Sequence, residues 1–507
     1  MTGILHRNGA GGMTGYGFKQ RMRRRRLALA LSLAVTTGIA LDGGAWTHTA
    51  SANGGVDYET ATIGYAGKNF TVQMVTVDLK NPFLRVEPVI ASGGIGHVES
   101  LSSMTERTEA AAAVNGTFFD AYAADETQKY PNGLMLRAGE IMRSGENQTF
   151  AVSVDKVPII NKLKLGMTVT VKHNGDAYSF SPWGVNTYYG AEAYDQVIWY
   201  TRDFGEKVSF PGGTKVVVSN GIITEITDGE ATIPEDGQVC FIGHTDGNKK
   251  YMLSKLHVGD EVFVEAKVEN KDSGDTGLAG GWDAAIGVGP KLVTNGAVDV
   301  DFARDGFDDP KITSSSNVRS FVGIDEQKRL VLGTVSSSTI SQMANVLAEL
   351  GLTDAMNLDG GASSGLFYEG ALKRTPGRLL SNALVVKRYD EPQVQVVVNG
   401  KFITEYRGFI RNNTTMAPFR GIFEAIDAFF TWNNDERTLS VQRDGKQIVL
   451  RPDEATALVD GQTVKLEEPA TIVDGHMYIP LRFVAETLGA KVQWNQELYR
   501  AELTVSK

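Results

Sequence analysis

Apolar and polar residues alternate over much of this chain, and a period of two is typical of β-strands that bury one face. Thr71–Leu79 alternates in this way, and Leu84–Ile90 is a second apolar segment shortly after it. Asn220-Gly221 and Asn295-Gly296 accompany further apolar runs, and Asn-Gly pairs favour the tight turns of β-hairpins. The pattern predicts many short strands, preceded at residues 53–70 by a polar lead-in segment.

Helical periodicity is clear in one stretch that begins after Thr339. Gln342 follows three residues later, as in a capping box, and Gly351 is a suitable glycine for the C-terminal end. Because strands outnumber helices, we predict an α+β domain with a β-rich mixed sheet over residues 56–390. The buried face of the predicted helix consists of Ile340, Met343, Leu347 and Leu350.

A smaller domain follows the Asp390-Glu391-Pro392 segment, and it contains an internal repeat. Met416–Arg420 resembles Tyr478–Arg482, and each is followed by an apolar helix and a Trp-Asn pair. The prolines at 418 and 480 and the tryptophans at 432 and 494 are each 62 residues apart. One spacing that holds twice indicates duplication, so residues 393–507 are predicted to form a small α+β domain of two repeats.

The N-terminus has the pattern of a secretory signal peptide. A basic block at Arg21–Arg26 precedes the largely apolar Leu27–Leu41, and Ala50-Ser51-Ala52 is a small-residue cleavage signal. The apolar run is short for a membrane span, although an uncleaved anchor is the alternative. We therefore expect residues 1–52 to be removed and the protein to be secreted or held at the cell surface.

Charge and cysteine content narrow the classes of partner and site. The formal net charge is −10, and loss of the basic leader makes the chain more negative, so no nucleic-acid partner is expected. The single cysteine, Cys240, permits no intramolecular disulfide and is expected in the core. The histidines are scattered without the close spacing of zinc or copper sites, so no metal ligands are predicted.

Asp299–Asp309 is an acidic loop, and clustered carboxylates suit calcium. It lacks the spacing and the closing glutamate of a helix–loop–helix calcium site, and a solvated loop is the other interpretation. We expect no cofactor, with a bound calcium ion as the one possibility left open.

Candidate chemistry gathers in Asp354–Gly365, at the end of a predicted strand. The strand delivers an amide and a carboxylate, and two glycines then allow a sharp turn and close approach of a ligand. Such a turn can form an anion-binding concavity, although a glycine-rich hairpin is the simpler interpretation. The candidate residues here are Asn357, Asp359, Gly360, Gly361, Ser363 and Ser364.

A second strand end offers a similar set of groups, with Asn115, Gly116 and Asp120 in N-G-T-F-F-D. Glycoside hydrolysis needs two carboxyl groups, and Asp283 is a further candidate. Arg319 suits a phosphate, which it can bind through two parallel hydrogen bonds, or it forms a structural ion pair.

Gly361–Gly365 also satisfies the G-x-S-x-G pattern of serine hydrolases. That mechanism needs a strand–nucleophile–helix elbow and a later histidine, whereas Leu366–Gly370 has the pattern of strand and turn and only His476 follows. A serine esterase is therefore disfavoured. A P-loop is excluded because no Gly-Lys pair follows the glycines.

Four motifs resemble, in order, those of the phosphodiester glycosidase family: V-N-G-T-F-F-D, V-R-S-F-V-G-I-D, N-L-D-G-G-A-S-S and R-x-L-S-N-A-L-V-V. The resemblance implies an exported hydrolase that releases a sugar from a carbohydrate phosphodiester substrate. It also suggests Asp359 as the leading catalytic carboxylate, with Asp120 or Asp283 as its partner.

The same resemblance suggests roles for the remaining candidates. Asn115, Arg319 and the backbone of Gly360 and Gly361 would hold the phosphate and the sugar hydroxyls. Ser363 would help to orient the substrate, together with Asn382 from the last motif.

The repeat region resembles the stalk domain of bacterial surface proteins, a domain also described as similar to the N-terminal domain of copper amine oxidases. The likeness does not imply copper, because the region contains one histidine and copper prefers several nitrogen ligands. It implies a module for adhesion or spacing that contacts a cell-wall or surface polymer. A non-catalytic binder of cell wall or exopolysaccharide is thus the alternative to the hydrolase.

Overall fold

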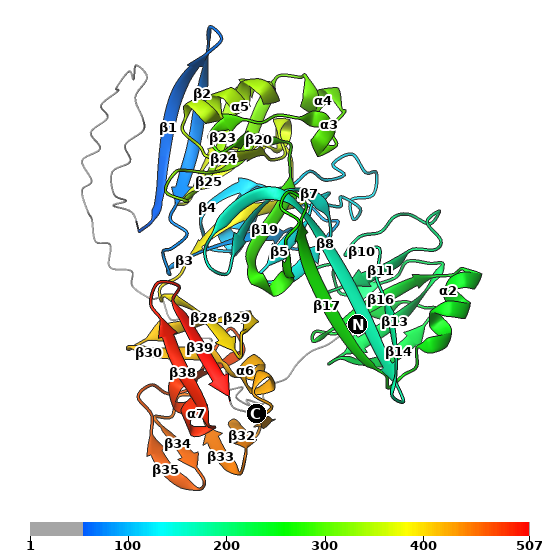
Figure 1. The fold of residues 1–507 in the computed structure, drawn as a ribbon, viewed down its shortest axis with the longest axis vertical. Helices are drawn as coiled ribbons and strands as arrows, with labels where there is room; N and C mark the ends of the chain where they lie inside the picture. Colours follow the sequence, from blue (N-terminus) through cyan, green and yellow to red (C-terminus); the bar gives the residue numbers. More distant parts are fainter. Residues whose placement is uncertain (1–53, 506–507) are drawn as a thin grey trace, which may run out of the picture. The chain divides into compact units, whose positions relative to one another are not determined.

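The computed structural model describes residues 54–505, apart from the side chains of residues 404–406. The predicted signal peptide, residues 1–52, lies outside the described residues. Strands greatly outnumber helices (Figure 1), which confirms the predicted β-rich α+β class. Within the described part of the chain, no helix is both long enough and apolar enough to cross a membrane.

The first sheet is antiparallel, and helix α5 (Ile340–Glu349) covers one of its faces (Figure 1). Thr339 and Gln342 form the predicted capping box, and the apolar side of α5 packs on Phe321 and Val335. In spatial order the strands are β1 (Val56–Tyr65), β2 (Lys68–Val77), β23 (Leu330–Ser338), β22 (Asn317–Ile324), β24 (Asp354–Asn357), β20 (Lys291–Thr294) and β21 (Ala297–Val298).

Strand β1 lies where the sequence predicts a polar lead-in segment, so that prediction is wrong for residues 56–65. β1 pairs with β2 along its whole length, but it is an edge strand and many of its side chains are partly or fully exposed. Its polar residues reflect this exposure, since an antiparallel strand can leave one face in water.

The second sheet is also antiparallel and has helix α1 (Leu101–Arg107) on one face. Val114 and Leu384 of this sheet share one hydrophobic cluster with Val322 and Met356 of the first sheet, so the two sheets pack together around a common core. The strand order is β26 (Ala371–Arg374), β25 (Leu366–Tyr368), β4 (Ala110–Asn115), β27 (Asn382–Arg388) and β3 (Leu84–Ile90).

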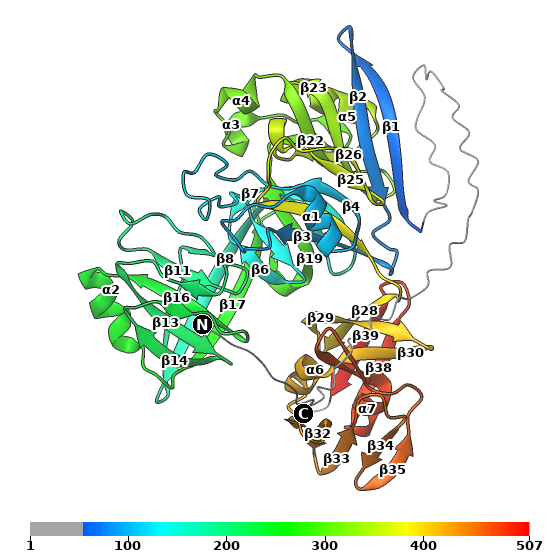
Figure 2. The same ribbon diagram turned by 180° about the vertical axis from the view of Figure 1, so that it is seen from behind.

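A third and larger sheet is formed mainly by residues 135–288. Its two long strands, β8 (Pro158–His173) and β17 (Glu261–Asn270), lie side by side over ten residue pairs (Figures 1 and 2). Cys240 is buried in its core, as expected. The other strands along its main path are β10 (Gly184–Val185), β11 (Val197–Tyr200), β16 (Gly237–Gly243), β13 (Gly213–Ser219), β14 (Ile222–Thr227), β7 (Glu146–Ser153), β19 (Trp282–Val288), β5 (Met135–Arg137) and β6 (Glu140–Arg143).

The C-terminal part of the chain shows the repeat as two copies of strand, helix and hairpin around one hydrophobic core. The copies contribute their hairpins to two different sheets, which lie beside each other in Figure 2. The first copy consists of β30 (Thr414–Pro418), α6 (Phe419–Ala425), β31 (Phe429–Asn433) and β32 (Thr438–Arg443). The second consists of β37 (His476–Pro480), α7 (Leu481–Thr487), β38 (Ala490–Asn495) and β39 (Arg500–Val505).

Candidate active site

The candidate site lies where the chain leaves β4 and β24, and the buried side chain of Asn115 joins the two strand ends. Its Nδ2 donates to the carbonyl oxygen of Asp359 at 2.6 Å. Its Oδ1 accepts from Ser320 Oγ at 2.7 Å and from Gly365 N at 3.0 Å. Asn115 therefore holds the 359–365 loop in place, and its amide oxygen is already used within the protein.

Asp359 is the ionisable group at the centre of this loop. Its carboxylate accepts from the backbone N–H of Gly360 at 2.9 Å and from the hydroxyl of Ser363. Burial raises the pKa of Asp359 to about 6, although these two donors and the positive charges of Arg378 and Arg319 act in the opposite direction. A carboxyl group that titrates near pH 6 suits general acid–base work close to neutral pH.

Arg319 approaches the same loop from β22 and is almost fully buried. Its Nε and Nη2 donate to the carbonyl oxygens of Ser338, Lys311 and Ser315, at 3.3, 3.0 and 2.6 Å. Burial lowers its pKa, and the charge of Asp359 opposes that shift. The partners recorded for Arg319 are carbonyl oxygens, so they fix the guanidinium group without neutralising it.

Arg319 lies in van der Waals range of the loop backbone at Gly360. A Cβ on Gly360 would lie 3.5 Å from Arg319 Cδ and 3.6 Å from its Nη1. The loop continues as a short 3₁₀ turn, η3 (Gly361–Ser363), in which Gly361 has a positive φ of 62°. A guanidinium group and bare backbone therefore lie next to the carboxyl group, an arrangement that favours an anionic ligand.

Three residues near Asp359 are absent from the sequence prediction: Tyr122, Arg378 and Lys311. Arg378 Nη2 donates to the hydroxyl of Tyr122 at 3.2 Å, and Lys311 Nζ lies 5.4 Å from the Tyr122 ring centroid. Both cations lower the pKa of Tyr122, and the charge of Asp359 acts in the other direction. Arg378 is the first residue of the motif R-x-L-S-N-A-L-V-V, so this motif could have indicated it from the sequence.

Asn382 and Gly116 line the junction between β27 and the end of β4. Asn382 Oδ1 accepts from the backbone N–H of Thr117 at 2.8 Å, and its Nδ2 donates to Ser381 Oγ at 2.7 Å. A Cβ on Gly116 would lie 1.9 Å from Asn382 Oδ1, so only glycine fits there. The carbonyl oxygen of Gly116 accepts from the N–H of Asp359 at 3.1 Å, which ties this junction to the loop.

Asn357 and Ser364 are also bonded within the protein and buried. Asn357 Nδ2 donates to the carbonyl oxygen of Gly289 at 3.0 Å, and Ser364 Oγ donates to the carbonyl oxygen of Val318 at 3.2 Å. These contacts fix the last strand residue and the far end of the loop. Asn357 and Ser364 therefore support the loop that carries Asp359.

Asp120 lies on the loop after β4, and its side chain is exposed. Its backbone N–H donates to the carbonyl oxygen of Tyr130 at 3.1 Å. The charge of Asp120 helps to raise the pKa of Tyr130 to about 12, although burial and Asp125 contribute more. Asp120 thus interacts with Tyr130 in this structure, and its pairing with Asp359 stays a prediction.

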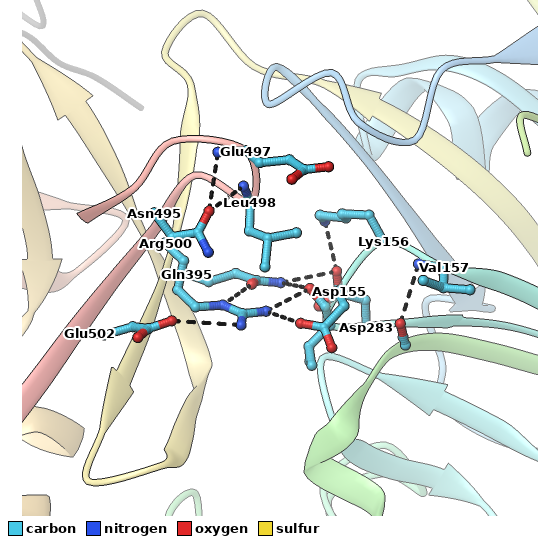
Figure 3. Close-up of polar contacts among 12 residues, drawn as sticks. Asp155, Lys156, Val157, Asp283, Gln395, Asn495, Glu497, Leu498, Arg500 and Glu502 are labelled. Carbon is cyan, nitrogen blue, oxygen red and sulfur yellow. Dashed lines mark hydrogen bonds and ion pairs between the residues drawn. The ribbon is translucent and has the colours of Figure 1, made fainter. Parts of the chain in front are cut away.

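Asp283 does not lie at this site. It is buried near the start of β19, where it forms ion pairs with Lys156 at 2.7 Å and with Arg407. Its Oδ2 also accepts a hydrogen bond from Gln395 Nε2 at 3.4 Å (Figure 3). The other end of β19 reaches Asn357 through Gly289. Five residues of strand span about 17 Å, so Asp283 is separated from Asp359 and serves as a structural carboxylate.

Several carboxylates of the acidic loop already have partners within the protein, both in the loop and on neighbouring segments. Asp299 pairs with Arg304 at 2.7 Å and accepts from Thr294 Oγ1 at 2.6 Å. Asp301 caps α3 (Phe302–Asp305), and Asp309 caps α4 (Pro310–Thr313). These contacts favour a folded surface loop over a calcium site.

The comparisons with known proteins match two ranges of the chain to two families. Residues 212–387 match the phosphodiester glycosidase family, and this range includes Arg319, Asp359 and Arg378. Residues 397–503 match the copper amine oxidase N-terminal domain. No curated protein sequence matches the chain.

Two solved structures share the fold. A hypothetical protein from Synechocystis has 20% identity and a TM-score of 0.55, over 66% of this chain and 62% of its own length. A Burkholderia pseudomallei protein described as exported has 18% identity and a TM-score of 0.51, over 63% of this chain and 74% of its own. This chain thus spans less than two thirds of the Synechocystis protein.

The catalytic domain of zebrafish N-acetylglucosamine-1-phosphodiester alpha-N-acetylglucosaminidase, auto-inhibited by its pro-peptide, is also similar. It has 13% identity and a TM-score of 0.35, over 68% of this chain and 86% of its own.

Proposed function

We propose that this chain, whose residues 212–387 match the phosphodiester glycosidase family, is an exported hydrolase that cleaves a glycosyl phosphodiester and releases the sugar. One observation carries the proposal. Asp359, with a pKa raised to about 6, lies within the electrostatic reach of Arg319 and Arg378. A carboxyl group with cations beside it suits a substrate in which a sugar carbon is bonded to a phosphate oxygen.

The leaving group explains why a cationic site is needed. The bond between the sugar C1 and the phosphate oxygen breaks, and the phosphate leaves as a monoester whose second pKa is near 6. Such a group departs with little help from a proton donor, so stabilising its charge is the main requirement. In this proposal Arg319 and Arg378 stabilise that charge, and such preorganised donors typically contribute about 3–4 kcal/mol each to the transition state.

Asp359 then acts on the sugar. In its ionised form it either directs a water molecule to C1 or attacks C1 itself. In the second case water then displaces the carboxylate, so that the C1–carboxylate bond breaks as the oxygen of water bonds to C1. The proton released from water passes to Asp359 and on to solvent, which its pKa of about 6 allows. Because the leaving phosphate needs no strong acid, a second carboxyl group such as Asp120 is helpful but not required.

The test is hydrolysis of UDP-N-acetylglucosamine and of nitrophenyl-phosphate diesters of sugars by the chain without residues 1–52. We expect free sugar and a phosphomonoester from the wild type and from Asp308→Asn, which changes an exposed carboxylate of the acidic loop. We expect at least a 100-fold loss in Asp359→Asn. An unchanged rate of hydrolysis in Asp359→Asn would refute the proposal that Asp359 is the catalytic carboxylate.

A second candidate function is non-catalytic binding of a cell-wall or exopolysaccharide polymer through residues 393–507. The exposed aromatic residues Phe429 and Trp432 on β31 favour it, because such rings bind the apolar faces of sugars. Co-sedimentation with insoluble wall material, compared between the whole chain and Phe429→Ala, measures this binding. Binding by a protein that releases no sugar from any phosphodiester would favour this function over hydrolysis.

A further inference from the structure

Two histidines that are far apart in the sequence meet at one end of the long β8–β17 pair. His173 is the last residue of β8, and His257 lies in the loop that leads into β17. The pairing of Lys172 with Glu261 brings the preceding residue, Asp260, next to His173. The two histidines are separated by 84 positions along the chain, so their sequence spacing gives no sign of this proximity.

The buried carboxylate of Asp260 lies between the two imidazole rings. His173 Nδ1 is 2.5 Å from Asp260 Oδ1, and His257 Nδ1 is 3.5 Å from Asp260 Oδ2. Oδ2 also accepts from the backbone N–H of His257 at 2.8 Å. The ring centroids of the two histidines are 4.2 Å apart, so both rings lie against one carboxylate.

We infer that His173, His257 and Asp260 bind one divalent transition-metal ion, with Zn²⁺ as the best fit. Ligand atoms from all three side chains lie within 4.8 Å of one another. Zinc bonds of about 2.0–2.2 Å in a tetrahedron place ligand atoms roughly 3.3 Å apart. Binding of the ion would replace the present hydrogen bonds of His173 to Asp260 and Asn174 with ligand bonds. Water would complete the coordination, because both histidines are partly or fully exposed.

The side chains at this cluster are of the types that bind Zn²⁺, since two imidazole rings and one carboxylate lie together. A divalent ion binds neutral imidazoles and the carboxylate together and releases any protons they carry. His244 offers a contrast, since it contacts one exposed carboxylate, Asp228, at 3.1 Å and belongs to no cluster of three possible ligands within residues 54–505.

The position of the cluster indicates that the ion has a structural role. The backbone around Asp260 also holds β14, because Ile223 N donates to the carbonyl oxygen of Asp260 at 2.9 Å and Gly259 N donates to that of Ile223 at 2.8 Å. A metal ion here would fasten the end of β8 to the start of β17 and to β14. It would stabilise the third sheet without touching Asp359.

The experiment is a titration of the tag-free chain lacking residues 1–52 with Zn²⁺, followed by calorimetry, with Co²⁺ absorption as a report on nitrogen and oxygen ligation. We expect one ion per chain and a higher Tm in its presence. His257→Ala should weaken binding by at least about 10- to 100-fold and abolish the Tm increase. His244→Gln, the matched control, should leave both unchanged.

A second variant distinguishes loss of the metal site from loss of folding. His173→Gln keeps an amide that can still donate to Asp260 but removes the imidazole, so a normal circular dichroism spectrum with lost zinc binding supports the site. Absence of stoichiometric binding in the wild type would overturn the inference, as would equal binding by the wild type and the double variant His173→Gln/His257→Ala. Binding lost equally in His244→Gln would also overturn it.

Discussion

Replacement of Asp359 by asparagine should make the folded protein more stable while it removes activity. Burial raises the pKa of Asp359 from its ordinary 3.8 to about 6. Since one pKa unit is worth about 1.4 kcal/mol, ionising this group in the folded state costs about 3 kcal/mol more than ionising it in the unfolded chain. Asparagine keeps the shape and can still accept from Gly360 and donate to Ser363, but it carries no charge.

The effect of Asp359→Asn on stability has a definite sign and depends on pH in a defined range. Below about pH 4 the carboxyl group is protonated in both states, and this contribution to stability is fully present. It is lost as the pH rises through the folded pKa of about 6. The stability advantage of Asp359→Asn should therefore be about 3 kcal/mol at pH 8 and below about 1 kcal/mol at pH 4.

The assay is urea unfolding of wild type and variant at both pH values, followed by tryptophan fluorescence. Comparing the two proteins at the same pH cancels the titration of every other group, and Asp308→Asn controls for the loss of one surface charge. A variant less stable than the wild type at pH 8, or an advantage of the same size at both pH values, would refute the reasoning.

Four further predictions concern the site and its supports. The kcat/KM of the wild type on a glycosyl phosphodiester should rise about tenfold per pH unit below pH 6 and level off above it; a flat profile between pH 4.5 and 6 would contradict the need for ionised Asp359. Arg378→Ala should lower kcat/KM by about 10²-fold, with the unfolding free energy changed by less than about 1 kcal/mol, because the side chain is partly exposed. Gly116→Ala should destabilise the fold by about 1–3 kcal/mol, because the new Cβ clashes with Asn382 Oδ1. Urea unfolding measures this loss, and unchanged stability would disprove the clash. Asp283→Asn should lower the free energy of unfolding by about 3–5 kcal/mol, because it leaves buried cations unpaired. The kcat per folded molecule should be unchanged, and a specific loss of kcat would indicate a catalytic role for Asp283.

The fold class was predictable because strand and helix periods are local properties of the sequence. Alternation located β2 and β3, and the capping box located α5. β1 was missed since an edge strand with polar side chains has the composition of a loop. The pairing of β4 with β27, by contrast, joins segments that no local pattern connects.

The loop at Asp359 was predictable because its groups are consecutive in the sequence. The role of Asn115 as a support was not, since its partners are backbone and hydroxyl groups more than 200 positions away. Asp283 looked catalytic because residue type alone cannot show that Lys156 and Arg407 neutralise it.

The side chain of Asn115 contacts residues 205, 244 and 250 positions later in the chain. Such distant contacts form late in folding, because a long loop must close before they are made. A nascent polypeptide cannot assemble the Asp359 loop until most of the first domain has been synthesised. Any function that depends on this loop therefore begins only after the chain has been synthesised through Gly365 and has folded.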